Sequence, residues 1–205
     1  MADNSTKITK DKLLRFLESD YYNMILKAWL KAYARVGGNS NMVIKKYILE
    51  EGGLINHQRL DHYFPTIEDI YKMTRTRFAL QMKDVMYGYL HQNATGSVFW
   101  TNYLMAVRNC KKECMIAIRR KDYLFFRASL NRLQPALEQS VFECAGNELV
   151  YRRCYAALLG ILYSIVEEWD QNNYAAGDLN RYAREIAQLS YSFNHSTATF
   201  DYILR

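Results

Sequence analysis

Apolar side chains recur along most of the chain at the three- and four-residue intervals of an α-helix. In residues 20–36 this stripe consists of Tyr22, Ile25, Trp29, Tyr33 and Val36, which predicts one amphipathic helix. Similar stripes predict helices over residues 8–19, 42–51, 56–63, 66–92, 98–120, 123–133, 136–145, 149–172 and 179–193. No segment alternates apolar and polar residues as a strand does. The pattern therefore predicts an all-α fold.

Pro65 marks the sharpest boundary in this pattern. Proline disfavours helical geometry in the residue before it, so the preceding helix should end at Phe64. Thr66 then stands as an N-cap, and Asp69, three residues later, completes a capping-box pattern. The three helices before this boundary are joined by short turns that contain Gly-Gly pairs, which is typical of a helix-turn-helix unit.

Composition fits two helical domains. The 205 residues are 50% apolar and include only 2 prolines and 9 glycines, which favours long helices over many short strands. We expect a three-helix unit in residues 1–65, with a short helical extension at its start, and a larger helical domain in residues 66–205. The N-terminus is polar, and no run of about 18 apolar residues suggests a membrane span. Four cysteines do not indicate a disulfide framework in a chain of this length, so we expect a cytoplasmic protein without a membrane partner.

The net charge is +6 and the isoelectric point is near 9.0. The excess of basic residues is larger in residues 1–80 than in the rest, which indicates either an anionic partner or an ordinary solvated surface. The motifs G-x-G-x-x-G, P-loop, G-x-S-x-G and H-E-x-x-H do not occur. We therefore do not expect an enzyme.

Four segments near the N-terminus carry a recognisable pattern. They are Ile25-Leu26-Lys27-Ala28, then Tyr33-Ala34 with Gly37, then the segment ILEEGGL at residues 48–54, and Leu60-Asp61-His62-Tyr63-Phe64. Together they resemble the N-terminal DNA-binding domain of TetR-family transcriptional regulators. The chain length fits the family, and residues 160–173, GILYSIVEEWDQNN, are similar to the penultimate helix of many members. The resemblance implies a homodimeric, ligand-responsive repressor in which a small-molecule inducer changes the spacing of the two DNA-binding heads.

The resemblance also implies which residues meet double-stranded operator DNA. Residues 56–63 would form the recognition helix in the major groove. The expected DNA-binding residues are Lys45, Lys46, Asn56, His57, Gln58, Arg59, His62 and Tyr63. Gln and Arg side chains can pair with adenine and guanine edges, whereas Tyr63 and the two lysines would contact phosphates. The two-fold symmetry of a dimer would match a palindromic operator.

Departures from the family pattern leave a second function open. Asp61 stands where the pattern has Tyr, Ile67 stands where it has Lys, and the segment from Gly53 to Phe64 is one residue longer. An acidic side chain near phosphate is unfavourable for DNA binding. The alternative is a helical ligand-binding or protein-interaction dimer of the same fold that has lost productive DNA contact.

The C-terminal domain holds many aromatic side chains. Because family members commonly hold the inducer in an apolar cavity, the candidate pocket residues are Trp100, Tyr103, Phe126, Phe142, Tyr155 and Tyr163. The alternative is that aromatics at helical spacing form the core. No cofactor is expected, and the sequence does not identify an inducer.

Cys110 and Cys114 lie four residues apart, on one face of the expected helix. Such a pair suits a soft metal or a thiol-redox sensor, with Cys144 or Cys154 as further ligands. Two buried small hydrophobic residues are the favoured alternative, because the spacing lacks the paired pattern of zinc sites. His57 and His62 are five residues apart and do not share a helix face. No metal site is therefore expected.

Residues 155–166 are apolar nearly all round, so one helix face should need a partner surface. The two last long helices are expected to form a dimer interface, as similar helices do in the TetR family. The interface residues expected are Leu158, Leu162, Ile165, Trp169, Tyr182, Ile186 and Leu189. The alternative is a monomeric bundle with this helix at its centre.

Overall fold

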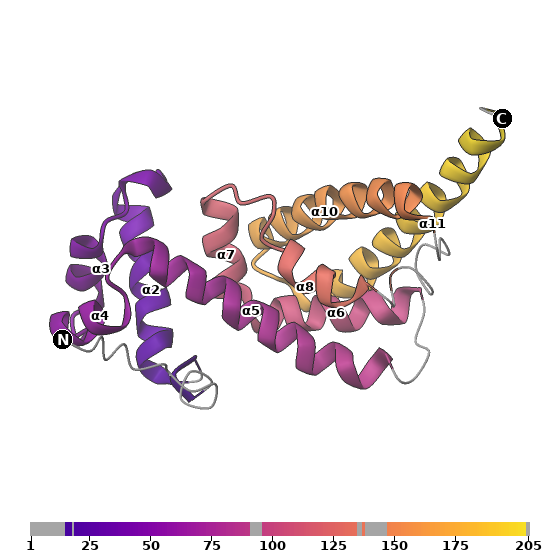
Figure 1. Cartoon of the computed structure of the whole chain (residues 1–205). Coiled ribbons are helices and arrows are strands. Elements are labelled where there is room, and N and C mark those ends of the chain that lie inside the picture. Colours follow the sequence, from indigo (N-terminus) through magenta and orange to yellow (C-terminus); the bar gives the residue numbers. More distant parts are fainter. Residues whose placement is uncertain (1–14, 18, 91–95, 135–136, 138–146, 204–205) are drawn as a thin grey trace, which may run out of the picture. The chain divides into compact units, whose positions relative to one another are not determined.

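The computed structural model describes residues 15–17, 19–90, 96–134, 137 and 147–203, with side chains for 15–17, 19–82, 96–134, 137 and 147–192. Every regular element in these ranges is helical, which confirms the all-α class. The elements are α2 (Asp20–Arg35), η1 (Ser40–Met42), α3 (Lys45–Gly52), α4 (His57–Tyr63), α5 (Ile67–Leu90), α6 (Ser97–Asn109), α7 (Lys111–Arg119), α8 (Arg127–Arg132), α10 (Glu148–Gln171), η3 (Ala176–Asp178) and α11 (Leu179–Ile203), as Figure 1 shows. The helix expected at 136–145, most of the one expected at 8–19, and the residues Phe142 and Cys144 lie outside the described residues.

The chain divides into two compact units, Met1–Met73 and Thr74–Arg205, so the division falls inside α5. The expected cap at the start of α5 is present: Asp69 Oδ2 accepts hydrogen bonds from the Thr66 amide at 2.9 Å and from its hydroxyl at 2.7 Å. The Asp69 amide donates to Thr66 Oγ1 at 3.2 Å in return. This reciprocal pair confirms the capping box and satisfies N–H groups that a helix start leaves without partners.

In the first unit, α2, α3 and α4 lie together (Figure 1), and their buried side chains form a small aromatic and aliphatic core. Its members come from all three helices and from the residue after α4, and each is at most 1% exposed: Tyr22, Ile25, Leu26, Trp29, Ile48, Leu60 and Phe64. A short helical turn at residues 15–17 adds Leu17, which is also 1% exposed. Burying these large side chains contributes the main stabilisation of a unit this small.

The second unit is organised around α11, against which α6 and α10 pack; α10 also packs against α7 (Figure 1). Its largest fully buried side chains include Phe78, Phe125, Phe126, Trp100, Tyr103, Trp169 and Tyr182. Trp169 Nε1 donates to the carbonyl oxygen of Ala175 at 2.9 Å, so this indole has its polar partner inside the core.

The single helix expected over residues 98–120 is two helices. At Cys110 the backbone has φ −102° and ψ 29°, outside the helical range, and α7 starts at the next residue. The Cys110 amide donates to the carbonyl oxygens of Ala106 and Val107, at 3.0 and 3.1 Å. Neither Gly nor Pro lies at the break, so the apolar pattern runs through it unchanged.

One helix in the described part of the chain, α10, is long and apolar enough by length and composition to cross a membrane. Its most apolar window has a mean hydropathy of 1.4, and 44% of that window is buried inside the protein. A core helix of a helical domain has the same length and composition, and α10 packs against α7 and α11 as such a helix does.

Candidate nucleic-acid interface

The turn between α3 and α4 depends on Gly53. Gly53 has φ 56° and ψ −54°, and the Leu54 amide donates to the Gly52 carbonyl at 2.5 Å, which closes a three-residue γ-turn. Glycine tolerates this positive φ, which other residues rarely adopt. Leu54 is 85% exposed, whereas Ile55 is 7% exposed. The turn therefore sends Leu54 to solvent and returns Ile55 to the core.

Asn56 caps the start of α4. Its Oδ1 accepts a hydrogen bond from the Arg59 amide at 2.9 Å, and its carbonyl oxygen accepts one from the Tyr21 hydroxyl at 3.3 Å. Asn56 is one of the residues expected to bind DNA. In the structure its Oδ1 serves as the N-cap acceptor of α4.

Helical geometry fixes which side chains of α4 face outward. Leu60 is fully buried and marks the inner side. With about 100° between successive residues, Gln58 and His62 lie on the opposite side, and both are exposed. His57 falls on one flank of the helix and Arg59 on the other.

The flank with Arg59 is held by aromatic rings. The Arg59 guanidinium lies over the Tyr21 ring, 4.2 Å from its centroid, an attractive cation–π contact. Tyr63 stacks on Phe16 with a centroid separation of 4.5 Å. Burial raises the pKa of Tyr21, and the nearby Arg59 lowers it in part. These contacts leave Arg59 exposed but held in one position, and Tyr63 half-buried.

The flank with His57 is held by one charged group from α3, the ammonium of Lys45. The ammonium of Lys45 donates to Asp61 Oδ1, to the Phe64 carbonyl at 2.7 Å and to the Pro65 carbonyl at 3.1 Å. His57 Nδ1 lies 2.8 Å from Asp61 Oδ2. The hydrogen bond from Lys45, with the positive charge of Lys45 beside it, holds the pKa of Asp61 below its usual value.

These contacts concern the roles of Lys45 and Asp61. Lys45 was expected at a phosphate, but its three hydrogen bonds fasten α3 to the end of α4. Asp61 was expected to repel DNA, but its charge is compensated by Lys45. Lys46 is 75% exposed, with Glu50 at 3.9 Å as an ion-pair partner, and its expected phosphate contact stays a prediction. The sequence did not indicate the two aromatic residues that support α4, Phe16 and Tyr21, because only the folded arrangement brings them next to this helix.

The aromatic residues expected to line a ligand cavity lie mainly in the core of the second unit. Trp100, Tyr103 and Phe126 are at most 1% exposed, and Tyr163 is 4% exposed. The Tyr103 hydroxyl is 2.9 Å from Ser129 Oγ, and the half-buried Tyr155 donates to the Arg127 carbonyl at 3.1 Å. Burial raises the pKa of Tyr103 well above its usual range, although Ser129 lowers it in part. These contacts describe packed core side chains.

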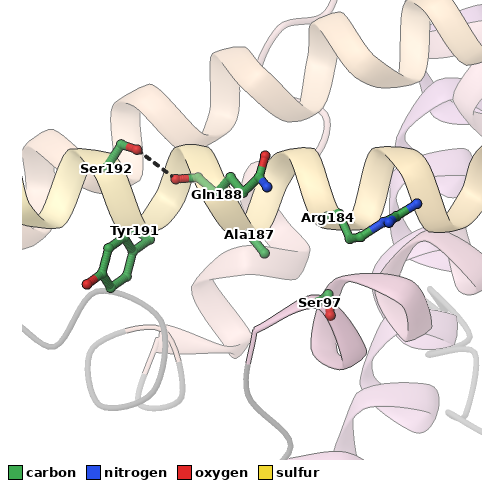
Figure 2. Close-up of a pocket in the computed structure, with 6 residues that line it drawn as sticks. All are labelled: Ser97, Arg184, Ala187, Gln188, Tyr191 and Ser192. Carbon is green, nitrogen blue, oxygen red and sulfur yellow. Dashed lines mark hydrogen bonds between the residues drawn. The ribbon is translucent and has the colours of Figure 1, made fainter.

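An open groove of about 580 Å³ lies instead beside α11, at the start of α6. It is lined by Ser97, Arg184, Ala187, Gln188, Tyr191 and Ser192. Figure 2 shows Arg184, Ala187 and Tyr191 along the edge of α11 that faces Ser97. The five α11 residues recur at helical spacing, and no signal in the sequence distinguishes them from an ordinary exposed helix face.

Cys110 and Cys114 are buried side chains of the second unit. Burial is the first cause that raises their pKa values, to about 12 for Cys110 and well above its usual value for Cys114. Burial thus disfavours the thiolate form of both side chains, which agrees with the alternative that they are small buried hydrophobic residues. Within the residues that the structure describes, no group of three or more His, Cys, Asp or Glu side chains is placed to hold a metal ion.

The side chains expected at a dimer interface are mostly internal to the chain. Six of them are at most 4% exposed, and the seventh, Leu189, is half-buried; the six are Leu158, Leu162, Ile165, Trp169, Tyr182 and Ile186. A side chain buried in its own chain cannot also form the surface that a partner meets. The exposed face of α10 includes Ala156, Gly160 and Ser164 at four-residue spacing, and it continues at the same spacing into the charged Arg152 and Glu168.

No family model, no curated protein and no solved structure matches the chain.

Proposed function

We propose that the chain is a DNA-binding transcriptional regulator in which α3 and α4 act as a helix-turn-helix. The observation that carries the proposal is the outer face of α4, where Gln58 and His62 are exposed opposite the buried Leu60. A short recognition helix needs such polar, outward side chains to meet base edges in the major groove. The lengths of α2, α3 and α4 suit a three-helix DNA-binding unit.

The electrostatics of this face support the same proposal. Lys46 and Arg59 are exposed cations on α3 and α4, and exposed cations of this kind favour binding to a phosphate backbone. The acidic side chain of α4, Asp61, is neutralised by Lys45 rather than presented alone. On the strength of the sequence resemblance to the TetR family, the proposal includes a ligand-responsive repressor. Its inducer and its operator stay predictions.

The first experiment is binding of the full chain to duplex DNA from its own upstream region, against a scrambled duplex, across a salt series. A regulator binds the specific duplex with a Kd on the order of 10⁻⁸ M or tighter at physiological salt. The logarithm of its affinity falls linearly with the logarithm of salt concentration. Gln58→Ala should weaken the preference for the specific duplex, whereas Gln171→Ala, an exposed position on α10, should not.

One observation favours a second function, a helical interaction protein that has lost DNA contact. The ammonium of Lys45 is hydrogen-bonded within the first unit, and position 67 is isoleucine rather than lysine. Two cations that the resemblance would place at phosphates are therefore missing from the exposed face. Equal and weak binding to both duplexes, unchanged by Gln58→Ala, would support this function and contradict DNA recognition.

Homodimerisation is part of the proposal, because two copies are needed to match a palindromic operator. The exposed small residues of α10 would let two helices approach closely, and a Cβ at Gly160 would meet no other atom within 4 Å in the single chain. Gly160→Trp should lower the sedimentation coefficient from that of a dimer to that of a monomer. Lys111→Trp, at an exposed site on α7, should leave it unchanged.

A further inference from the structure

Asp61 connects two basic side chains on one flank of α4. Its Oδ1 accepts from the ammonium of Lys45, and its Oδ2 lies 2.8 Å from His57 Nδ1. The same ammonium also donates to the carbonyl oxygens of Phe64 and Pro65, at 2.7 and 3.1 Å. Three oxygen atoms therefore fix the position of the Lys45 ammonium, and the ammonium in turn fixes the orientation of the carboxylate.

This orientation decides which nitrogen of His57 carries the hydrogen. An ionised carboxylate only accepts hydrogen bonds, so the hydrogen between the two side chains must be on Nδ1. A neutral imidazole has one N–H group, which leaves Nε2 with a lone pair. His57 is the first residue of α4 and is 72% exposed, so Nε2 is the ring nitrogen left for an external partner.

We propose that Lys45 and Asp61 are positioning residues that present His57 as a hydrogen-bond acceptor, and that His57 thereby selects a base with an exocyclic amino group. The inference rests on the proposed function, because it needs the start of α4 to lie in the major groove. There, adenine N6 and cytosine N4 are the donors, whereas guanine O6 and thymine O4 are acceptors that would face the Nε2 lone pair. A preference of roughly tenfold for adenine or cytosine at this position is expected for one such hydrogen bond.

The geometry predicts that Asp61→Asn reverses the base preference of His57 rather than only removing it. Lys45 offers only donors, so its ammonium holds the oxygen of the new amide, and the amide nitrogen then faces His57. Nδ1 must now accept a hydrogen bond, and the hydrogen of the ring moves to Nε2. His57 becomes a donor toward DNA, and the preferred base becomes guanine or thymine. Asp61→Ala leaves Nδ1 without this partner and should remove the preference without reversing it.

The first arm of the test reads the tautomer directly, without DNA. Proton–nitrogen NMR spectra of the full chain in mildly alkaline buffer should show Nδ1–H for His57. The signal is assigned by its loss in His57→Ala. Asp61→Asn should move the hydrogen to Nε2, and the control Asp20→Asn, at an exposed position on α2, should not. A wild-type ring that carries its hydrogen on Nε2 overturns the inference.

The second arm is selection of bound duplexes from a randomised library by the wild-type chain, Asp61→Asn and Asp61→Ala. One base pair in each half-site should change from adenine or cytosine to guanine or thymine in Asp61→Asn, with the other positions unchanged. A shifted tautomer with an unchanged base preference overturns base reading by His57. A wild-type chain that selects no sequence at all overturns the proposed function and base reading together, and the NMR result then decides the positioning by Lys45 and Asp61 alone. Circular dichroism confirms that each variant is folded.

Discussion

Two adjacent lysines on α3 should respond in opposite ways to the same substitution. Lys45 has a side chain 20% exposed and fastens the start of α3 to Asp61 and to two carbonyl oxygens at the end of α4. Lys46 is 75% exposed, with Glu50 at 3.9 Å. Replacing each by methionine removes the ammonium and keeps a flexible apolar stem of similar length. Lys45→Met should weaken the folded unit, and Lys46→Met should weaken DNA binding.

The magnitudes follow from the partners of each ammonium. Hydrogen bonds to a charged group contribute about 1.5–3 kcal/mol when buried, but Asp61 is 43% exposed and water replaces part of its bond. For Lys45→Met we expect a loss of about 1–2 kcal/mol, which raises the open fraction of α4 by a factor of roughly 5 to 30. A long, exposed pair such as Lys46 with Glu50 contributes at most about 0.5 kcal/mol.

Hydrogen exchange read by mass spectrometry on peptides from α3 and α4 measures this local opening. The same variants are then titrated with DNA across a salt series, where each lost phosphate contact lowers the slope by about 0.9. Lys45→Met should speed exchange and leave the slope unchanged, and Lys46→Met should do the reverse. Equal exchange in the two variants would refute the fastening by Lys45, and a reduced slope in Lys45→Met would place its ammonium at a phosphate after all.

Two further predictions concern packing and pH. Gly52→Ala would bring its Cβ to 2.2 Å from Ile55 Cδ1, so we expect it to destabilise the first unit by about 1–3 kcal/mol, measured by urea unfolding. The control Gly160→Ala, in open space on α10, should be neutral or stabilising. Equal losses of stability in the two variants would contradict the clash. Burial raises the pKa of Glu113 above its ordinary 4.5, although Arg77 lowers it in part. The folded chain therefore binds a proton at Glu113 more tightly than the unfolded chain does. The contribution of this group to stability consequently falls as pH rises above about 4.5. Glu113→Gln should therefore become more stable relative to wild type between pH 4 and pH 7.5 in urea unfolding, whereas a constant difference would contradict a raised pKa.

Local patterns in the sequence were sufficient to predict the helices around Pro65. The end of α4 and the capping box of Thr66 and Asp69 depend on residues within a few positions of each other. The break at Cys110 was not predicted, because neither proline nor glycine marks it and apolar residues continue on both sides. Such a break is decided by which surfaces the two short helices cover, and tertiary packing overrides the local pattern.

The apolar stripe of α10 shows a different limit of sequence reasoning. A helix that is apolar nearly all round must be covered on both sides, but its pattern does not say whether the cover comes from the same chain or from a second copy. In the structure, Leu162 and Trp169 are covered within one chain. The choice between a dimer face and a central core helix depends on the whole fold, and the fold places a small-residue stripe outward instead.

The site was harder to predict than the fold, because its contacts join residues distant in the sequence. Helical spacing was enough to place Gln58 and His62 opposite Leu60. Nothing in the sequence linked Lys45 to Asp61, which are 16 positions apart and meet only when α3 packs against α4. Taken separately, an acidic residue on a recognition helix indicates weak DNA binding and a lysine on the preceding helix indicates a phosphate contact. Taken together, they neutralise each other, and what they leave exposed is the imidazole of His57 in one defined tautomer. An acidic side chain at position 61 is therefore compatible with the proposed DNA recognition, provided that Lys45 remains. Lys45→Met should consequently disturb the proposed base preference of His57 as well as the stability of α4.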